Sequence, residues 1–215
     1  MQNQSLKAQI VSRISQQKSG YVWTPADFID LGSRDAVDKT LQRLVTSSQM
    51  RRVHRGLYDK PENNRFTGKV TPPDYQSVIS AVSRQHKVKV LIDGMTAAND
   101  LGLTNAVPAK VIVHTDGRLQ PIKIDNLAIQ FRVTTPKKIY WADHPAMKIV
   151  QALYWLHDVL PQEHDRVSQK ILYILQTKDV DGKIRDDLNK GLDTLPMWMR
   201  KFIDGILKVS DSCPA

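Results

Sequence analysis

The first thirty residues contain apolar positions whose spacing predicts two short helices. Residues 5–17 place apolar side chains every three or four positions, as one face of an amphipathic helix requires. Thr24 followed by Pro25 is typical of a helix start, because proline at the first helical position has no N–H to satisfy. Gly32 should end this second helix after few turns.

A third helix is predicted directly after Gly32, because Ser33 can accept a hydrogen bond from its first turn. The apolar stripe of this helix should be buried, and it consists of Val37, Leu41, Leu44 and Val45. The opposite face carries Arg34, Asp35, Asp38, Lys39, Gln42 and Arg43. Two helices joined by a tight Gly-Ser turn predict a helix-turn-helix.

The next segment, MRRVHRGLYDKP from Met50 to Pro61, alternates and then turns at Gly56, as a β-hairpin does. A hairpin after the second helix of a helix-turn-helix makes the motif winged. In a winged motif the second helix lies in the major groove of DNA, and the wing contacts the backbone or the adjacent minor groove. The cations of this hairpin are followed by no acid before Asp59.

We therefore expect the predicted helix and wing to bind double-stranded DNA. Lysine and arginine neutralise phosphates and release counterions, and a cation on the outer helix face can reach the O6 and N7 atoms of guanine. The candidate DNA-binding residues are Ser33, Arg34, Lys39, Gln42, Arg43, Arg51, Arg52, His54 and Arg55. His54 is assigned to the wing because the sequence pairs it with no nucleophile or carboxylate. Three observations oppose this interpretation: charged helix faces are commonly only solvated, Asp35 and Asp38 would repel phosphate, and winged helices also bind proteins.

Residues 63–73 are rich in Pro, Gly and Asn, so they are predicted to be a linker between residues 1–62, the winged helix-turn-helix, and residues 74–215. The second domain should be α+β. Its predicted elements are a helix over 74–86, a strand over 88–92, a helix from Asp93 to Gly102, a three-stranded meander over 110–134 turning at Asp116-Gly117 and Asp125-Asn126, and four C-terminal helices within 146–207. The predicted fold class is α+β, with a small antiparallel sheet and C-terminal helices in the second domain.

Charge strengthens the assignment of the N-terminal segment to a polyanionic partner. The 215 residues contain 31 Lys and Arg against 22 Asp and Glu, a formal net charge of +9. Residues 1–69 contain twelve of these cations against six acids and thus account for +6.

Other composition features exclude some classes of site. The single cysteine, Cys213, cannot form an internal disulfide or a cysteine-based zinc site. No apolar run approaches the roughly 20 residues of a membrane span, and the N-terminal segment is too polar for a signal peptide, so we expect a cytoplasmic protein with no membrane partner.

Few residue patterns indicate catalysis. Asp181-Gly182-Lys183 formally matches the acid-x-Lys of a Mg²⁺-dependent nuclease, but a turn before a helix explains it better. His114, Asp116 and Arg118 alternate near a strand end and could bind a ligand, although a hairpin turn at Asp116-Gly117 is the simpler interpretation. A Gly-rich phosphate loop is absent. We expect no catalytic residue, no metal site and no cofactor.

The tryptophans Trp141, Trp155 and Trp198, together with Met199, are expected in the core. An alternative is that Trp198 and Phe202 face a partner.

The order TPADF, LGSRDAVDKTLQRLV and MRRVHRGLYDKP, followed by LIDGMTAANDLGLTNAVPAKVIVHTDGR, resembles the AbiEi family of bacterial antitoxins from type IV toxin-antitoxin systems. The resemblance covers most of residues 5–160, and the helices after about residue 162 match only loosely. It implies a winged helix-turn-helix that binds an inverted-repeat operator and represses its own operon. It also implies a C-terminal domain that neutralises, directly or functionally, a cognate nucleotidyltransferase-type toxin.

Two alternatives remain beside the antitoxin hypothesis. One is a DNA-binding enzyme, such as a metal-dependent nuclease, whose winged helix only delivers the substrate. The other is a stand-alone transcriptional regulator that senses a small ligand through its α+β domain.

Overall fold

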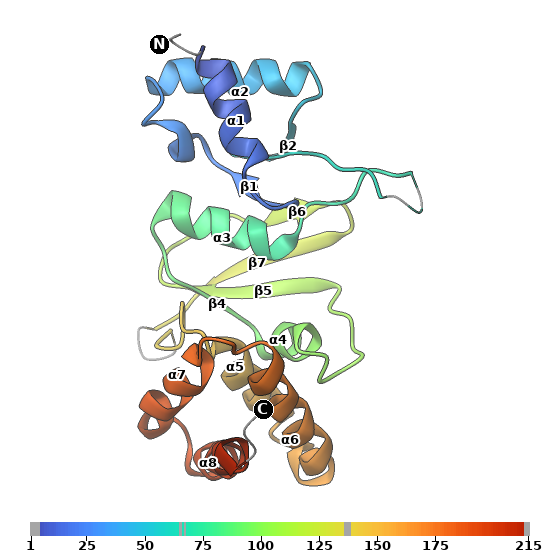
Figure 1. The fold of residues 1–215 in the computed structure, drawn as a ribbon, viewed down its shortest axis with the longest axis vertical. Coiled ribbons are helices and arrows are strands. Elements are labelled where there is room, and N and C mark those ends of the chain that lie inside the picture. Colours follow the sequence, from blue (N-terminus) through green and yellow to red (C-terminus); the bar gives the residue numbers. More distant parts are fainter. Residues whose placement is uncertain (1–4, 65, 67, 136–138, 213–215) are drawn as a thin grey trace. The chain divides into compact units, whose positions relative to one another are not determined.

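The protein is described by a computed structural model of residues 5–64, 66, 68–135 and 139–212, apart from the side chains of 210–212 (Figure 1). Cys213, on which the disulfide expectation rests, lies outside these residues. The fold is α+β. The chain divides into an N-terminal unit, residues 1–88 with 121–129, and a C-terminal unit, residues 89–120 with 130–215.

The N-terminal unit begins with the predicted helices, and the caps expected at Thr24 and Ser33 are present. Ser5 and Ser33 accept backbone N–H bonds at the starts of two α-helices, and Thr24 begins a capping box with Asp27. The helix after Thr24 is a single 3₁₀ segment, so the prediction of a short helix is confirmed with a tighter geometry. The elements are α1 (Leu6–Ser15), β1 (Val22–Trp23), η1 (Pro25–Phe28), α2 (Arg34–Thr46), β2 (Arg51–His54) and β3 (Leu57–Asp59).

One hydrophobic core joins these helices. The predicted stripe of α2 is buried at Val37, Leu41 and Leu44 and partly buried at Val45. Phe28 of η1 is fully buried, and its ring lies 5.0 Å from that of Trp23. The core consists of Ile10, Ile14, Trp23, Phe28, Val37, Leu41, Leu44, Met50 and Tyr58. Burial of this stripe turns the polar face of α2 toward solvent.

The predicted hairpin is present as β2 and β3, which pair antiparallel and turn at Gly56. Gly56 has a φ of +75°, a conformation that a side chain disfavours. β3 also pairs with β1, so the strand order of this small sheet is β1-β3-β2. The first strand of the unit therefore lies at one edge and β2 at the other.

The segment predicted as a linker folds back on itself. Asn63 and Val70 form a β-bridge, and the Thr71 N–H donates to Glu62 O at 2.7 Å; residues 65 and 67 lie outside the described residues. Helix α3 (Tyr75–His86) follows and packs on β1 and β3. The division into two compact units falls after α3, at residue 88.

A second sheet contains β4 (Val90–Ile92), β5 (Lys110–Thr115), β6 (Ile122–Ile124) and β7 (Leu127–Val133). Its order is β4-β5-β7-β6, so the predicted meander is wrong: β7, and not β6, lies beside β5. Asp116 does not make the predicted hairpin turn, because its carboxylate accepts the Lys89 N–H at 2.9 Å, just before β4. The predicted turn at Asp125-Asn126 joins β6 to β7, with Asp125 at a φ of +47°.

The C-terminal unit is completed by helices that the sequence predicted. Asp93 caps the first of them, α4, as expected. A side chain at Gly94 would lie 2.4 Å from the Gln151 carbonyl oxygen, so α4 and α5 approach closely at a position that only glycine fits. The helices are α4 (Gly94–Asp100), α5 (Met147–Leu156), α6 (Leu160–Thr177), α7 (Lys183–Gly191), η2 (Leu192–Thr194) and α8 (Met197–Ser212).

Across residues 5–64, 66, 68–135 and 139–212, none of the helices combines the length and the apolar character needed to cross a membrane.

Candidate nucleic-acid interface

The outer face of α2 begins at a capped and ion-paired turn. The Ser33 hydroxyl oxygen accepts the Ala36 N–H at 3.4 Å, and its own O–H is still able to donate to a phosphate oxygen. Arg34 pairs with Asp38 one turn along the helix at 2.8 Å, with both side chains exposed. An exposed pair of this kind contributes little free energy, so Arg34 can exchange Asp38 for another anion.

A groove of about 560 Å³ lies between this face of α2 and the hairpin. It brings together three of the predicted DNA-binding residues, Lys39, Gln42 and Arg52. The remaining lining residues are Asp35, Asp38, Val45, Thr46 and Tyr58. The groove is thus polar, with donors from a helix on one side and from a strand on the other.

Two neutral polar groups of the groove, Thr46 and Tyr58, were missed in the sequence. Thr46 follows Lys39 by seven residues, two helical turns, and so projects from the same face. Tyr58 is opposite Arg52 in the hairpin register. Helical periodicity could have assigned Thr46 to this face, and the alternation of the hairpin around Gly56 could have placed Tyr58 opposite Arg52.

Four predicted cations are exposed and unpaired. Lys39 and Arg43 lie four residues apart on α2, and Arg52 and Arg55 lie on the hairpin. Within the part of the chain that the structure describes, none of the four makes an ion pair with a carboxylate. Their guanidinium and ammonium groups are therefore available to an anionic partner.

Arg51 differs from these cations, because it forms an ion pair with a carboxylate of the same hairpin. Its guanidinium donates to both carboxylate oxygens of Asp59, at 2.9 and 2.5 Å, and to Thr71 O at 3.1 Å. The hydrogen bonds with Asp59 raise the pKa of Arg51 above its ordinary value. The antiparallel register causes this pairing, because it sets Asp59, the first acid after the wing cations, directly opposite Arg51.

The tip of the hairpin carries the last two predicted residues. The register shifts between Arg52 and His54, which is a β-bulge or related irregularity of β2. His54 and Arg55 are both exposed there. Behind the tip, a side chain on Gly56 would lie 3.3 Å from the Gln85 side-chain amide, so the turn rests against the last turn of α3.

The alternative nuclease residues form an exposed ion pair at the start of α7. Asp181 and Lys183 lie 2.5 Å apart with both side chains largely exposed, and the hydrogen bond from Lys183 lowers the pKa of Asp181. Buried Asp179 accepts the N–H groups of Ile184 and Arg185 and so anchors the helix start. Among the described residues, no three His, Cys, Asp or Glu side chains gather where they could hold a metal.

The aromatic residues of the C-terminal unit are only partly where we expected them. Trp141 and Met199 are buried as predicted, but Trp155 is 43% exposed. Phe202 is buried at 8% exposure, so it does not face a partner. Trp198 is half-buried and packs on His157, with a ring separation of 4.4 Å.

Comparison with known protein families identifies the chain at the family level. The chain matches the model of DUF6088, a family of unknown function, over residues 9–182, and it belongs to that family. No curated protein matches the chain.

Proposed function

We propose that this member of the DUF6088 family binds double-stranded DNA through α2 and the β2–β3 hairpin, and represses its own operon. The observation that carries the proposal is the set of exposed, unpaired cations on both elements, Lys39 and Arg43 on α2 and Arg52 and Arg55 on the hairpin. Two adjacent elements with free cations match the spacing of a groove and its flanking phosphates.

The element order supports this assignment. Helix, strand, helix, helix and hairpin follow one another, and the second hairpin strand pairs with the first strand of the unit. We propose that these elements form a winged helix-turn-helix, in which α2 would be the recognition helix and the hairpin the wing. The buried stripe of α2 leaves its polar face free for the major groove.

The charge distribution supports the same conclusion. The N-terminal unit contains fifteen Lys and Arg against eight Asp and Glu, and thus +7 of the formal net charge of +9. A positive unit raises the local concentration of a polyanion and accelerates encounter with it.

The candidate DNA-binding residues divide into two roles. Lys39 and Gln42 have the donors and acceptors that read guanine and adenine edges, respectively. Arg43, Arg52 and Arg55 would neutralise phosphates on either side. Asp35 and Asp38 lower the affinity for phosphate alone, so they favour sites where a base offers an amino group such as cytosine N4.

A salt titration tests the proposal directly. A duplex from the region upstream of the gene is labelled, and its binding is followed by fluorescence anisotropy between about 50 and 300 mM salt. Neutralisation of about four phosphates by Arg34, Arg43, Arg52 and Arg55 gives a log-log slope of about −3 to −4. A slope near zero would remove the DNA-binding function.

The antitoxin role stays a second proposal, which rests on the resemblance over residues 5–160. Co-expression tests it: the protein should rescue cells from a toxic nucleotidyltransferase-like neighbour. A stand-alone ligand-sensing regulator would repress but would not rescue.

The nuclease alternative has its own experiment. The protein is incubated with supercoiled DNA and Mg²⁺ or Mn²⁺, with Asp181→Ala as the matched variant. Metal-dependent cutting that this substitution abolishes would establish the enzyme and overturn the regulator.

A further inference from the structure

Polar contacts from α1 and from α3 fix the position of helix η1, and thereby the start of α2. On one side Arg13 of α1 donates to the Asp27 carbonyl at 2.6 Å and pairs with both carboxylate oxygens of Asp30. The Asp27 carboxylate accepts from the Thr24 N–H at 2.7 Å and from its hydroxyl at 3.0 Å. Since η1 is followed by α2 after only five residues, its position directs that helix.

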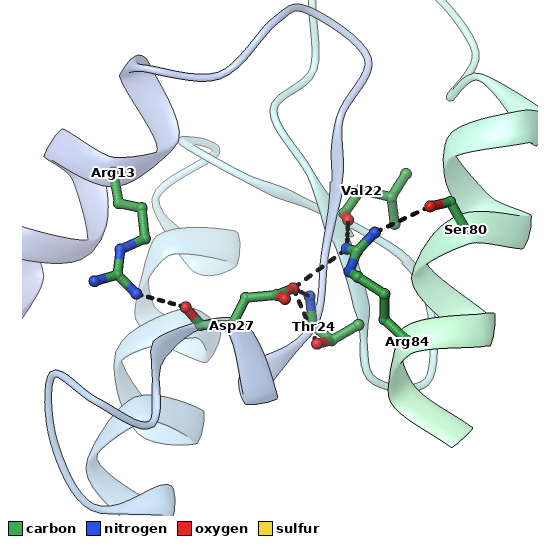
Figure 2. Close-up of polar contacts among 6 residues, drawn as sticks. All are labelled: Arg13, Val22, Thr24, Asp27, Ser80 and Arg84. Atoms are coloured by element: carbon green, nitrogen blue, oxygen red, sulfur yellow. Dashed lines mark hydrogen bonds and ion pairs between the residues drawn. The ribbon is translucent and has the colours of Figure 1, made fainter. Parts of the chain in front are cut away.

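The second hold comes from α3, through Arg84 (Figure 2). Its guanidinium donates to Val22 O of β1 at 2.9 Å and lies 3.5 Å from the Asp27 carboxylate. It also lies over the Tyr21 ring, 5.0 Å from the centroid, and donates to Ser80 Oγ at 3.2 Å. Arg84 thus satisfies a carbonyl of the edge strand β1 and binds η1 with one planar group.

The neighbouring residue of the same turn reaches the wing. Gln85 lies against Gly56, so the last turn of α3 contacts the support of α2 through one side chain and the hairpin turn through the next. Directly after this turn, Lys87 adopts a left-handed φ of +54°, and the chain enters β4 at Val90. The turn therefore lies where the N-terminal unit leads into the C-terminal unit.

We propose that Arg84 is a positioning residue, which sets α2 at the correct spacing from the wing. This inference rests on the proposed function. Arg84 is assigned to positioning and not to DNA contact, because its Nη1 and Nη2 atoms already donate hydrogen bonds within the unit.

The experiment compares Arg84→Ala and Arg84→Lys with Lys18→Ala, the loss of an exposed cation from the same unit, all in the full chain. In free protein, hydrogen exchange at the Leu31 and Val37 amides should accelerate in both Arg84 variants, because lysine lacks the planar fork that bridges Val22 and Asp27. DNA affinity should fall about fivefold to tenfold with an unchanged salt slope. Lys18→Ala should change neither exchange nor the affinity for operator by more than about twofold.

Three outcomes overturn the inference. If hydrogen exchange at the start of α2 is the same in Arg84→Ala as in wild type, Arg84 does not hold η1 in place. If hydrogen exchange is faster in the Arg84 variants but their affinity for operator DNA is unchanged, Arg84 does not position α2 for DNA binding. A loss of about 0.9 in salt slope that Arg84→Lys restores identifies Arg84 as a phosphate contact. If wild-type protein binds no duplex, the proposed function fails and the positioning role with it, while the exchange measurement still decides whether Arg84 clamps η1.

Discussion

Four cations of α2 and the hairpin differ from four cations of the C-terminal unit in where the nearest carboxylates lie. On α6 and α8, Arg166 pairs with Glu163 and Lys208 with Asp204, each within one helical turn. At the ends of α7, Lys183 pairs with Asp181, and Arg200 of α8 pairs with Asp193. Lys39, Arg43, Arg52 and Arg55 make no such pair within the described residues. The availability of a cation to DNA thus depends on the placement of acids, and the number of cations alone does not determine it.

Removal of the four free cations should have the largest effect on DNA affinity of the changes considered. The combined variant Lys39→Ala, Arg43→Ala, Arg52→Ala, Arg55→Ala should lose about 1000-fold in duplex affinity near physiological salt, because three phosphate contacts and one base contact are lost. The matched control is Arg166→Ala, Lys183→Ala, Arg200→Ala, Lys208→Ala, which removes the same charge from paired positions. Anisotropy titrations should show little change in this control; equal losses would mean that only net charge matters.

The Arg51 pair sharpens the comparison, since it is a paired cation inside the cationic hairpin. Arg51→Ala should lower the free energy of unfolding by about 2 to 3 kcal/mol, because it leaves the carboxylate of Asp59, 2% exposed, without a partner. Urea unfolding followed by tryptophan fluorescence measures this loss. The double variant Arg51→Met, Asp59→Leu should recover most of it. Stability equal to wild type in Arg51→Ala would mean that the pair does not hold the hairpin.

Gln42 tests whether the groove reads bases as well as phosphates. Gln42→Ala should reduce discrimination at one base pair by about 1 to 3 kcal/mol, since one bidentate contact to a base edge is lost. Binding to a library of operator variants measures the preference at each position. A uniform loss across all variants would reassign Gln42 to the backbone contacts.

The smallest expected effect concerns pH and the exposed Arg13–Asp30 pair beside η1. The hydrogen bond from Arg13 lowers the pKa of Asp30 below 3.8. A carboxylate with a lowered pKa in the folded state stabilises the protein above its unfolded pKa, and this contribution disappears as the pH falls through the folded pKa. Wild type should therefore have a slightly higher Tm than Asp30→Asn at about pH 6, and the two should converge as the pH falls through the lowered pKa of Asp30. A Tm difference that stays constant as the pH is lowered would contradict this origin.

Local rules account for most elements that were predicted correctly. The caps at Ser5, Ser33 and Asp93 and the turn at Gly56 depend on a few adjacent residues, so the sequence is sufficient to locate them. The pairing of β7 with β5 and the return of α3 to β1 and β3 depend on contacts between distant residues, which periodicity does not contain.

The candidate interface likewise contains residues that local patterns predict and residues whose roles depend on distant contacts. Periodicity along α2 was enough to assign Lys39 and Gln42 to its outer face. The role of Arg51 required the cross-strand register, because Asp59 follows it by eight residues and only the turn at Gly56 brings the two together. The hold of Arg84 on η1 spans 57 residues and had no local signal.

The edge of the second sheet has a consequence for the behaviour of the protein at high concentration. β6, one of its two edge strands, has three residues, follows Pro121, and carries the exposed, charged side chain of Lys123. A long, apolar edge would offer its amide and carbonyl groups to the strand of another molecule. This short and charged edge instead discourages intermolecular β-pairing at β6.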